Sequence, residues 1–60
     1  MDKFIGAYLN NGHSYTIKRR GDMREYTIVS FVDDIEIGVY NSINIAKRKA
    51  KEHIKRINER

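Results

Sequence analysis

The side chains of this chain that could take part in chemistry are two histidines, three serines and a surplus of cations. His13 follows a turn glycine and His53 borders an apolar helical stripe, so their separation fits neither a zinc site nor a catalytic triad. The serines lack the context of a nucleophile elbow, and there is no glycine-rich phosphate loop. The absence of cysteine excludes disulfides and thiolate chemistry. We therefore expect a protein that is not an enzyme and holds no metal or cofactor.

The cations gather near the C-terminus. From residue 43 to residue 60, seven cations face two glutamates, whereas the preceding residues carry five cations and six anions, so the net charge of +4 belongs to the last segment. On a helical wheel these cations flank an apolar stripe, with Arg48, Lys51 and Lys55 on one side and Lys49 and Arg56 on the other. Pairing at i,i+4 leaves a surplus. The segment is either a solvated, salt-bridged face or a phosphate-binding helix.

A second basic cluster, Lys18-Arg19-Arg20-Gly21 with Arg24, lies at an expected turn between the second and third strands. In a meander, this turn and the start of the following helix lie at the same end of the sheet. The arginines and the free amides around Ser42 can therefore converge on one anion, although arginines beside a glycine turn can also be simply exposed. The predicted nucleic-acid-binding residues are Arg19, Arg20, Arg24, Arg48, Lys51 and Lys55. Acidic residues at the other end, Asp33, Asp34 and Glu36, would leave the molecule electrically polarised.

These residues must be positioned by a small α+β domain that spans residues 1–60. Alternation predicts four extended segments, at residues 3–9, 14–20, 24–32 and 35–40, which form a three- to four-stranded antiparallel meander. The turns are Asn10-Asn11-Gly12, Gly21-Asp22 and Asp33-Asp34. Asn41 or Ser42 then caps one C-terminal helix, from Ile43 to Asn58, which packs on one face of the sheet. Its apolar stripe is Ile43, Ala46, Ala50, Ile54 and Ile57.

The turns also predict which side chains face the helix, because directly opposed residues in an antiparallel ladder share a face. A two-residue Asp33-Asp34 turn pairs Val32 with Ile35, Ser30 with Ile37 and Ile28 with Val39. The Gly21-Asp22 turn then pairs Ile17 with Tyr26 and Tyr15 with Ile28. In the first hairpin, a three-residue loop turns Ile5 and Leu9 inward, and a two-residue loop turns Phe4 and Tyr8 inward. We favour the three-residue loop.

The opposite face would then be apolar and aromatic, with one helix in the chain to cover the other side. Its expected members are Tyr8, Thr16, Lys18, Thr27, Val29, Phe31, Glu36, Gly38 and Tyr40. An apolar patch of this kind is typical of an interaction site, so Tyr8, Phe31 and Tyr40 are the predicted partner-binding residues. The partner would be another protein or a second copy of the chain.

Composition sets the remaining expectations. A chain of 60 residues forms one domain with a small core, so dimerisation or a bound partner is compatible with it. No apolar run reaches the length of a signal peptide or a membrane span, which predicts a soluble, cytoplasmic protein that binds no membrane. The wealth of Lys, Ile, Asn and Tyr is typical of an AT-rich coding source such as a phage or a low-GC bacterium.

The C-terminal half carries a pattern formed by Tyr26-Thr27-Ile28-Val29, Gly38, Ser42, Ala46-Lys47 and Ala50. This pattern resembles the last strands and final helix of double-stranded-RNA-binding domains. The resemblance implies a β-β-α half-domain that reads duplex shape through phosphate contacts near the start of its helix. The first helix of that family has no counterpart here, and its paired lysines correspond to Ile43 and Asn44.

Two functions remain open. The first is a small basic module that contacts the phosphate backbone of nucleic acid with little base preference. The second is a protein-interaction module that uses the open aromatic sheet face, such as a viral or mobile-element inhibitor of a host factor or a small homodimer.

Overall fold

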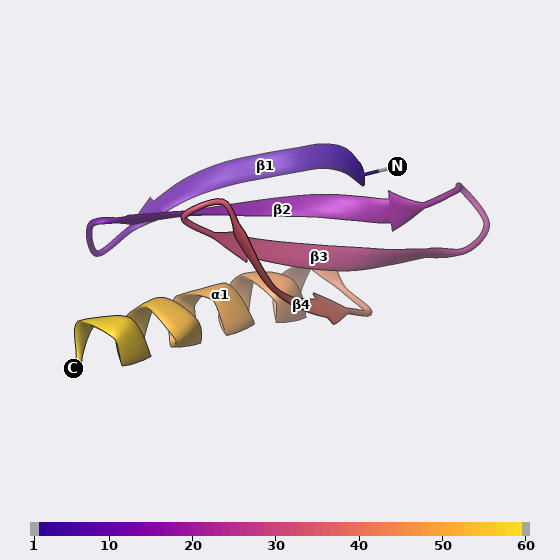
Figure 1. Ribbon diagram of the computed structural model, residues 1–60. Helices are drawn as coiled ribbons and strands as arrows, with labels where there is room; N and C mark the ends of the chain where they lie inside the picture. The colour runs from indigo at the N-terminus through magenta and orange to yellow at the C-terminus, as the bar shows by residue number, and fades with distance from the viewer. Residues whose placement is uncertain (1, 60) are drawn as a thin grey trace.

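Four antiparallel strands in chain order form one sheet, and the C-terminal helix crosses one face of it (Figure 1). The computed structural model describes residues 2–59. The elements are β1 (Asp2–Asn10), β2 (His13–Gly21), β3 (Tyr26–Val32), β4 (Ile35–Tyr40) and α1 (Ile43–Asn58). The α+β meander predicted from alternation is confirmed, and so are the bounds of the helix. Helix α1 packs mainly over β3, β4 and β2, which leaves β1 as an outer strand.

The first hairpin turns through two residues. Asn11 and Gly12 have φ angles of 48° and 84°, and Asn10 pairs with His13, as in the tight turns that match the twist of paired strands. The preference for a three-residue loop was therefore wrong. Tyr8 lies opposite Tyr15 and faces the helix, as the two-residue alternative required. Leu9 points the other way and is 86% exposed.

The β2–β3 connection is longer than predicted. It spans residues 22–25, and the Asp22 side chain holds it by accepting hydrogen bonds from the backbone amides of Arg24 and Glu25, both at 2.8 Å. These two bonds, the one from Glu25 being the larger cause, lower the pKa of Asp22. The longer loop slides the register by four residues. Tyr15 therefore pairs with Val32 instead of Ile28.

An even slide keeps each residue on its face, so the inward orientation predicted for Tyr15, Ile17 and Tyr26 holds although their predicted partners were wrong. Ile17 lies opposite Ser30, and Tyr26 lies opposite Gly21. The slide also sets Arg19 opposite Ile28, on the helix face, between residues of the core.

Both outer strands contain a bulge at the same short motif. The register skips Ile5 in the sequence Ile5-Gly6-Ala7-Tyr8 and skips Ile37 in Ile37-Gly38-Val39-Tyr40. Each extra residue moves the residues beyond it to the other face. In each motif the tyrosine ring lies back over the glycine, where a Cβ on Gly6 or Gly38 would overlap the tyrosine hydroxyl.

The β4 bulge overturns part of the predicted face assignment. Ile35 pairs with Val32 as predicted, but Gly38 lies opposite Ser30 and Tyr40 lies opposite Ile28. Gly38 and Tyr40 therefore face the helix, and Val39 faces the open side, opposite Val29. These three assignments were reversed because the prediction assumed an uninterrupted ladder.

The core lies between α1 and the inner face of the sheet. Ala46, Ala50 and Ile54 are fully buried and pack on Ile17 and the other inward residues, with Ile37 and Ile57 partly buried at the margin. The two alanines let the helix lie close to β3, where the Ser30 hydroxyl donates a 2.7 Å hydrogen bond to the Ala46 carbonyl. At the helix start the Ser42 hydroxyl accepts from the Ile45 amide at 3.1 Å, which confirms Ser42 as the cap.

Candidate nucleic-acid interface

The outward side of α1 carries cations that no carboxylate within residues 2–59 neutralises. Arg48 and Lys49 share one carboxylate, that of Glu52, at 3.8 and 3.6 Å. Lys51, Lys55 and Arg56 are exposed and form no ion pair within residues 2–59. Arg60, the remaining cation of this segment, lies outside the described residues. Intrahelical pairing therefore absorbs part of the charge and leaves Lys51 and Lys55 available to a ligand.

Lys47 extends this basic surface towards β1. Its ammonium lies 4.4 Å from the centre of the Tyr8 ring, and that ring is stacked on Tyr15 with a centroid separation of 5.0 Å. A cation over an aromatic face is stabilised by the ring quadrupole and remains positively charged. Lys47 was not among the predicted site residues. Its position beside buried Ile54 on the helical wheel, at the margin of the apolar stripe, is the sequence signal that indicates a side chain able to reach the sheet.

Arg20 has a different environment from the helix cations. It binds Asp2 through two hydrogen bonds of 2.8 and 3.0 Å and binds Glu36 at 2.6 Å. Hydrogen bonds from the guanidinium lower the pKa of both carboxyl groups, and the bonds that Arg20 donates, first to Asp2 and then to Glu36, raise the pKa of Arg20. To join β1 to β4 from its place on β2, the Arg20 side chain must cross β3. It does so on the face that carries no helix, which accounts for the 0% exposure of Val29 there.

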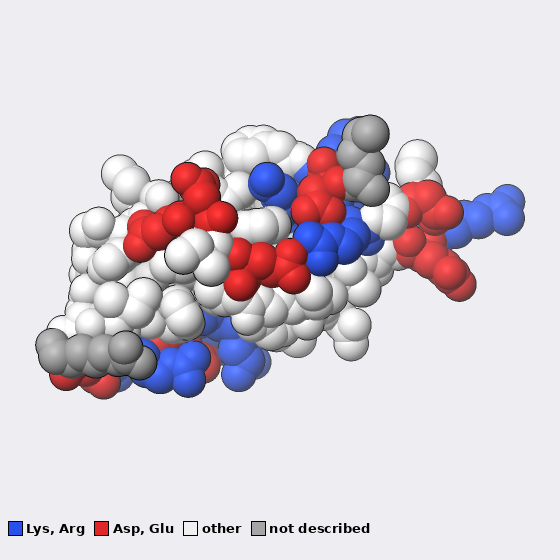
Figure 2. All heavy atoms as spheres, viewed as in Figure 1, with Lys and Arg blue, Asp and Glu red and all other residues white. Residues whose placement is uncertain are grey.

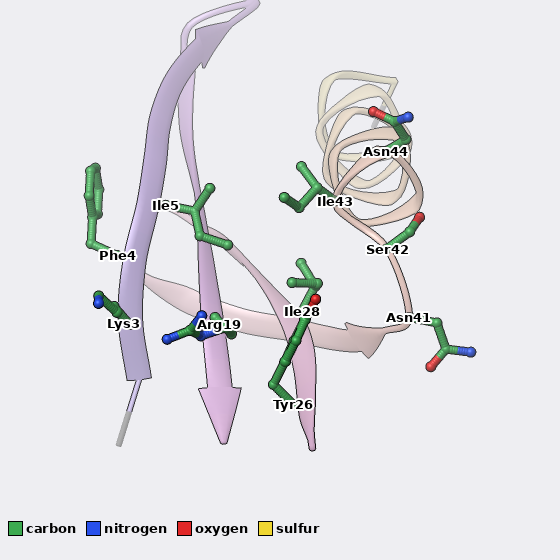
Figure 3. A pocket seen from close by; sticks show the side chains of 10 residues that line it. All are labelled: Lys3, Phe4, Ile5, Arg19, Tyr26, Ile28, Asn41, Ser42, Ile43 and Asn44. Carbon is green, nitrogen blue, oxygen red and sulfur yellow. The ribbon is translucent and has the colours of Figure 1, made fainter. Parts of the chain in front are cut away.

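Arg19 projects from the other face of β2. Its guanidinium lies 5.5 Å from the centre of the Tyr26 ring and forms no ion pair within residues 2–59. It lines a hollow of about 680 Å³ between the beginning of β1 and the beginning of α1 (Figure 3). The residues that line the hollow are Lys3, Phe4, Ile5, Arg19, Tyr26, Ile28, Asn41, Ser42, Ile43 and Asn44. The predicted convergence of an arginine with the helix start therefore holds for Arg19.

The predicted arginine cluster is divided by the sheet. Arg19 and Arg20 lie on opposite faces because successive strand residues alternate. Arg24 sits in the β2–β3 loop, is exposed, and is not among the residues that line the hollow. The structure thus brings Arg19 to the helix start and does not bring Arg20 there.

Charge is separated between the sheet and the helix. In Figure 2 carboxylates spread over the strands with Lys and Arg side chains among them, while the lower edge, where Figure 1 places α1, carries Lys and Arg side chains together with some carboxylates. Asp33 and Asp34 form the β3–β4 turn, with φ angles of 50° and 67°. Glu36 does not stay with them as an acidic end, because it is bound to Arg20. The short ion pairs, those of Arg20 with Asp2 and Glu36, therefore join strands, whereas the pairs of Glu52 on the helix are longer.

His13 ties the end of α1 to the strands. The Asn58 side chain donates to the Asn11 carbonyl at 3.2 Å, so its oxygen accepts from His13 Nε2 at 3.1 Å. His13 Nδ1 lies 2.6 Å from an Asp33 oxygen. Both ring nitrogens thus act as donors, which favours the imidazolium form. The hydrogen bond to Asp33 is the main cause of a raised His13 pKa, and the same bond lowers the pKa of Asp33.

Two of the three predicted partner-binding residues face the helix. Tyr8 and Tyr40 pack against the core, so the prediction that they lie on the open face was wrong, and the reason is the turn length in one strand and the bulge in the other. Phe31 does lie on the open face, with the Lys18 ammonium 4.7 Å from its ring centre. The apolar side chains that replace the tyrosines there are Phe4, Leu9 and Val39.

Comparisons with known proteins identify no relative. No family model matches the chain, and neither a curated protein nor a solved structure is significantly similar to it. The resemblance to double-stranded-RNA-binding domains therefore stays a prediction. Its marker residues have structural roles in this fold, since Ser42 caps α1 and Ala46 and Ala50 are buried against the sheet. Within residues 2–59 no cluster of side chains could hold a metal ion, and no helix is long and apolar enough to cross a membrane.

Proposed function

We propose that this protein binds nucleic acid through the phosphate backbone, with the outward side of α1 as the main contact. The observation that carries the proposal is the separation of charge. Lys51, Lys55 and Arg56 have no ion-pair partner in the part of the chain that the structure describes, while Arg20 is held by Asp2 and Glu36 on the opposite face of the sheet. A polyanion approaching the helix side meets exposed positive charge and few carboxylates.

The dimensions of the helix suit this contact. At 1.5 Å per residue, the 16 residues of α1 extend about 24 Å, which is about seven nucleotides along one strand of a duplex. Long, exposed lysine side chains contact phosphates without reading base edges. The proposed binding is therefore independent of base sequence. Lys47, which lies over the Tyr8 ring, extends the binding surface towards β1. A cytoplasmic location, with access to nucleic acid, is part of the proposal.

Salt dependence tests the proposal. Binding of a labelled duplex of arbitrary sequence is measured by fluorescence anisotropy between about 50 and 200 mM salt, where each neutralised phosphate contributes about 0.9 to the slope of log K against log salt. We expect the double variant Lys51→Gln with Lys55→Gln to bind more weakly and to lose about two units of slope. Both side chains are exposed and lie off the apolar stripe, so the fold is retained.

Lys18→Gln is the matched control. It also removes cationic charge, but from the open face, where Lys18 lies over Phe31. Affinity and slope close to those of the unmodified protein are expected for it. The proposal is wrong if the unmodified protein binds neither duplex nor single-stranded nucleic acid at about 50 mM salt, or if the control loses as much as the helix variant.

A second candidate function is self-association through the open face. Phe4, Leu9 and Val39 are 62%, 86% and 47% exposed, and Phe31 lies on the same side. The charged residues of that face balance one another, since Asp2 and Glu36 are matched by Lys18 and Arg20. Two copies could therefore meet there without net repulsion, whereas two helix sides would repel. The balanced charge of the open face therefore favours a second copy of the chain as the partner that binds there.

A further inference from the structure

The hollow at the start of α1 contains two cations and no anion. Lys3 and Arg19 are direct partners in the β1–β2 ladder, so their side chains start from the same face at the closest cross-strand spacing. Like charges in this arrangement repel. None of the ten residues that line the hollow is acidic. The repulsion between Lys3 and Arg19 is thus left uncompensated by the residues that form the hollow.

Arg19 differs from its neighbour Arg20 in how its guanidinium is satisfied. Arg20 donates three hydrogen bonds to carboxylates, whereas the Nε of Arg19 is buried and has no hydrogen-bond partner among the described residues. The Arg19 guanidinium lies 5.5 Å from the centre of the Tyr26 ring, which is within the range of a cation–π contact. Buried donors in folded proteins are nearly always paired, so the guanidinium of Arg19, unlike that of Arg20, keeps hydrogen-bonding capacity that an acceptor in the hollow could use.

The other walls of the hollow are apolar or offer amides. In Figure 3, Ile5 of β1 and Ile43 of α1 point towards one another across the upper part of the hollow, above Arg19. At the helix start, the Ser42 hydroxyl accepts a hydrogen bond from the Ile45 amide, and the Ser42 carbonyl accepts one from the Ala46 amide. The amides of Ile43 and Asn44 precede the first intrahelical donor and remain available.

We infer that this hollow binds the phosphate monoester of a nucleotide. Arg19 would supply the planar, charge-assisted contact that suits phosphate, Lys3 would add a second positive charge, and the amides at the start of α1 would complete the anion site. The nucleoside would lie against Ile5 and Ile43. A volume of about 680 Å³ falls within the range of small-molecule sites and exceeds what an inorganic anion requires. The inference does not depend on nucleic-acid binding by the outward side of α1.

Nuclear magnetic resonance tests the site directly, because a buried arginine Nε–H gives its own signal. The probes are adenosine 5′-monophosphate, adenosine and inorganic phosphate, each titrated to about 5 mM, a range suited to millimolar dissociation constants. We expect the monophosphate to shift the Arg19 Nε–H and the amides of Ile43 and Asn44. Adenosine should cause no such shift, and inorganic phosphate should bind more weakly because it lacks the apolar contact.

Variants separate this site from the helix surface. Arg19→Gln should weaken binding of the monophosphate at least about tenfold, and Arg19→Lys should fall between, because it retains charge without the planar fork. Lys18→Gln, on the other face of the same strand, and the double variant Lys51→Gln with Lys55→Gln should bind the monophosphate normally. If Arg19→Gln does not fold, Lys3→Gln replaces it and should weaken binding in the same direction.

Three results would overturn the inference. One is the absence of shifts at about 5 mM monophosphate. Another is equal binding of adenosine and its monophosphate, which would mean that the phosphate is not recognised. The third is inorganic phosphate binding as tightly as the monophosphate, which would exclude a nucleotide site. A protein that fails to bind duplex but shows the expected monophosphate shifts would refute the helix proposal and leave this one standing.

Discussion

Ile54 is the side chain whose truncation should reveal most directly how α1 is held. It is 0% exposed and packs within the buried cluster that includes Ile17 and Ile28. Replacing it with Ala removes three carbon atoms, which at about 0.8 kcal/mol each corresponds to about 2.4 kcal/mol of lost burial. The cavity left behind adds to this, so we expect a loss of about 3 to 4 kcal/mol in the free energy of unfolding.

That loss is large for a domain of this length. At about 0.05 to 0.15 kcal/mol per residue, a chain of 60 residues has a total stability of about 3 to 9 kcal/mol. Urea unfolding followed by circular dichroism, with a slope of about 1 kcal/mol per molar, should show the midpoint fall by about 3 M, or no folded baseline at all. If no baseline remains, Ile54→Val should still give a measurable transition, with a loss of about 0.5 to 1.5 kcal/mol.

Ile45→Ala is the matched control, because it removes the same three carbons from the same helix at a position that is 36% exposed and faces away from the sheet. Its expected loss is within about 0.5 kcal/mol, as for other surface changes. Equal losses for Ile45→Ala and Ile54→Ala would refute the reasoning, since the packing of α1 on the sheet could not then depend on the buried stripe.

Three further outcomes are expected. Gly38→Ala should destabilise the fold by about 1 to 3 kcal/mol, because the added methyl overlaps the Tyr40 ring, and urea titration should show this loss shrink in a Tyr40→Ala background. The folded-state pKa of His13 lies above 6.5, so the stability that His13 contributes should be complete below pH 6.5 and should be lost as the pH rises through the folded-state pKa. The pKa of Asp33 lies below 3.8, so the stability that Asp33 contributes should be lost in acid, as the pH falls through its folded-state pKa. Thermal melts of His13→Gln should therefore lack the loss of stability at high pH. Sedimentation should show concentration-dependent dimers that Phe31→Ser weakens, and a monomer at high concentration whose solubility and binding are unchanged by Phe31→Ser would exclude the open face as an interface.

Local chemistry in the sequence determined which elements form. Alternation placed the strands, residues that tolerate positive φ placed the first and last turns, and an apolar stripe behind the Ser42 cap placed α1 with its bounds. The surplus of cations on the outward side of α1 could also be predicted from the sequence, because the positions of Lys51 and Lys55 around the helix follow from helical periodicity alone. These features depend on neighbours within a few residues.

The tertiary structure decided which strand residues meet and which faces they share. One bulged residue in β1 and one in β4 reverse every side chain beyond them, and the Asp22 loop slides β2 against β3, so Arg19 comes to rest beside Tyr26 on the helix face. Such choices depend on pairing between distant segments, where a glycine beneath a tyrosine ring is favoured only once the sheet has formed. The repeated Ile-Gly-x-Tyr motif carries the signal for both bulges. The hollow around Arg19, by contrast, exists only because strands and helix converge there from separate parts of the chain.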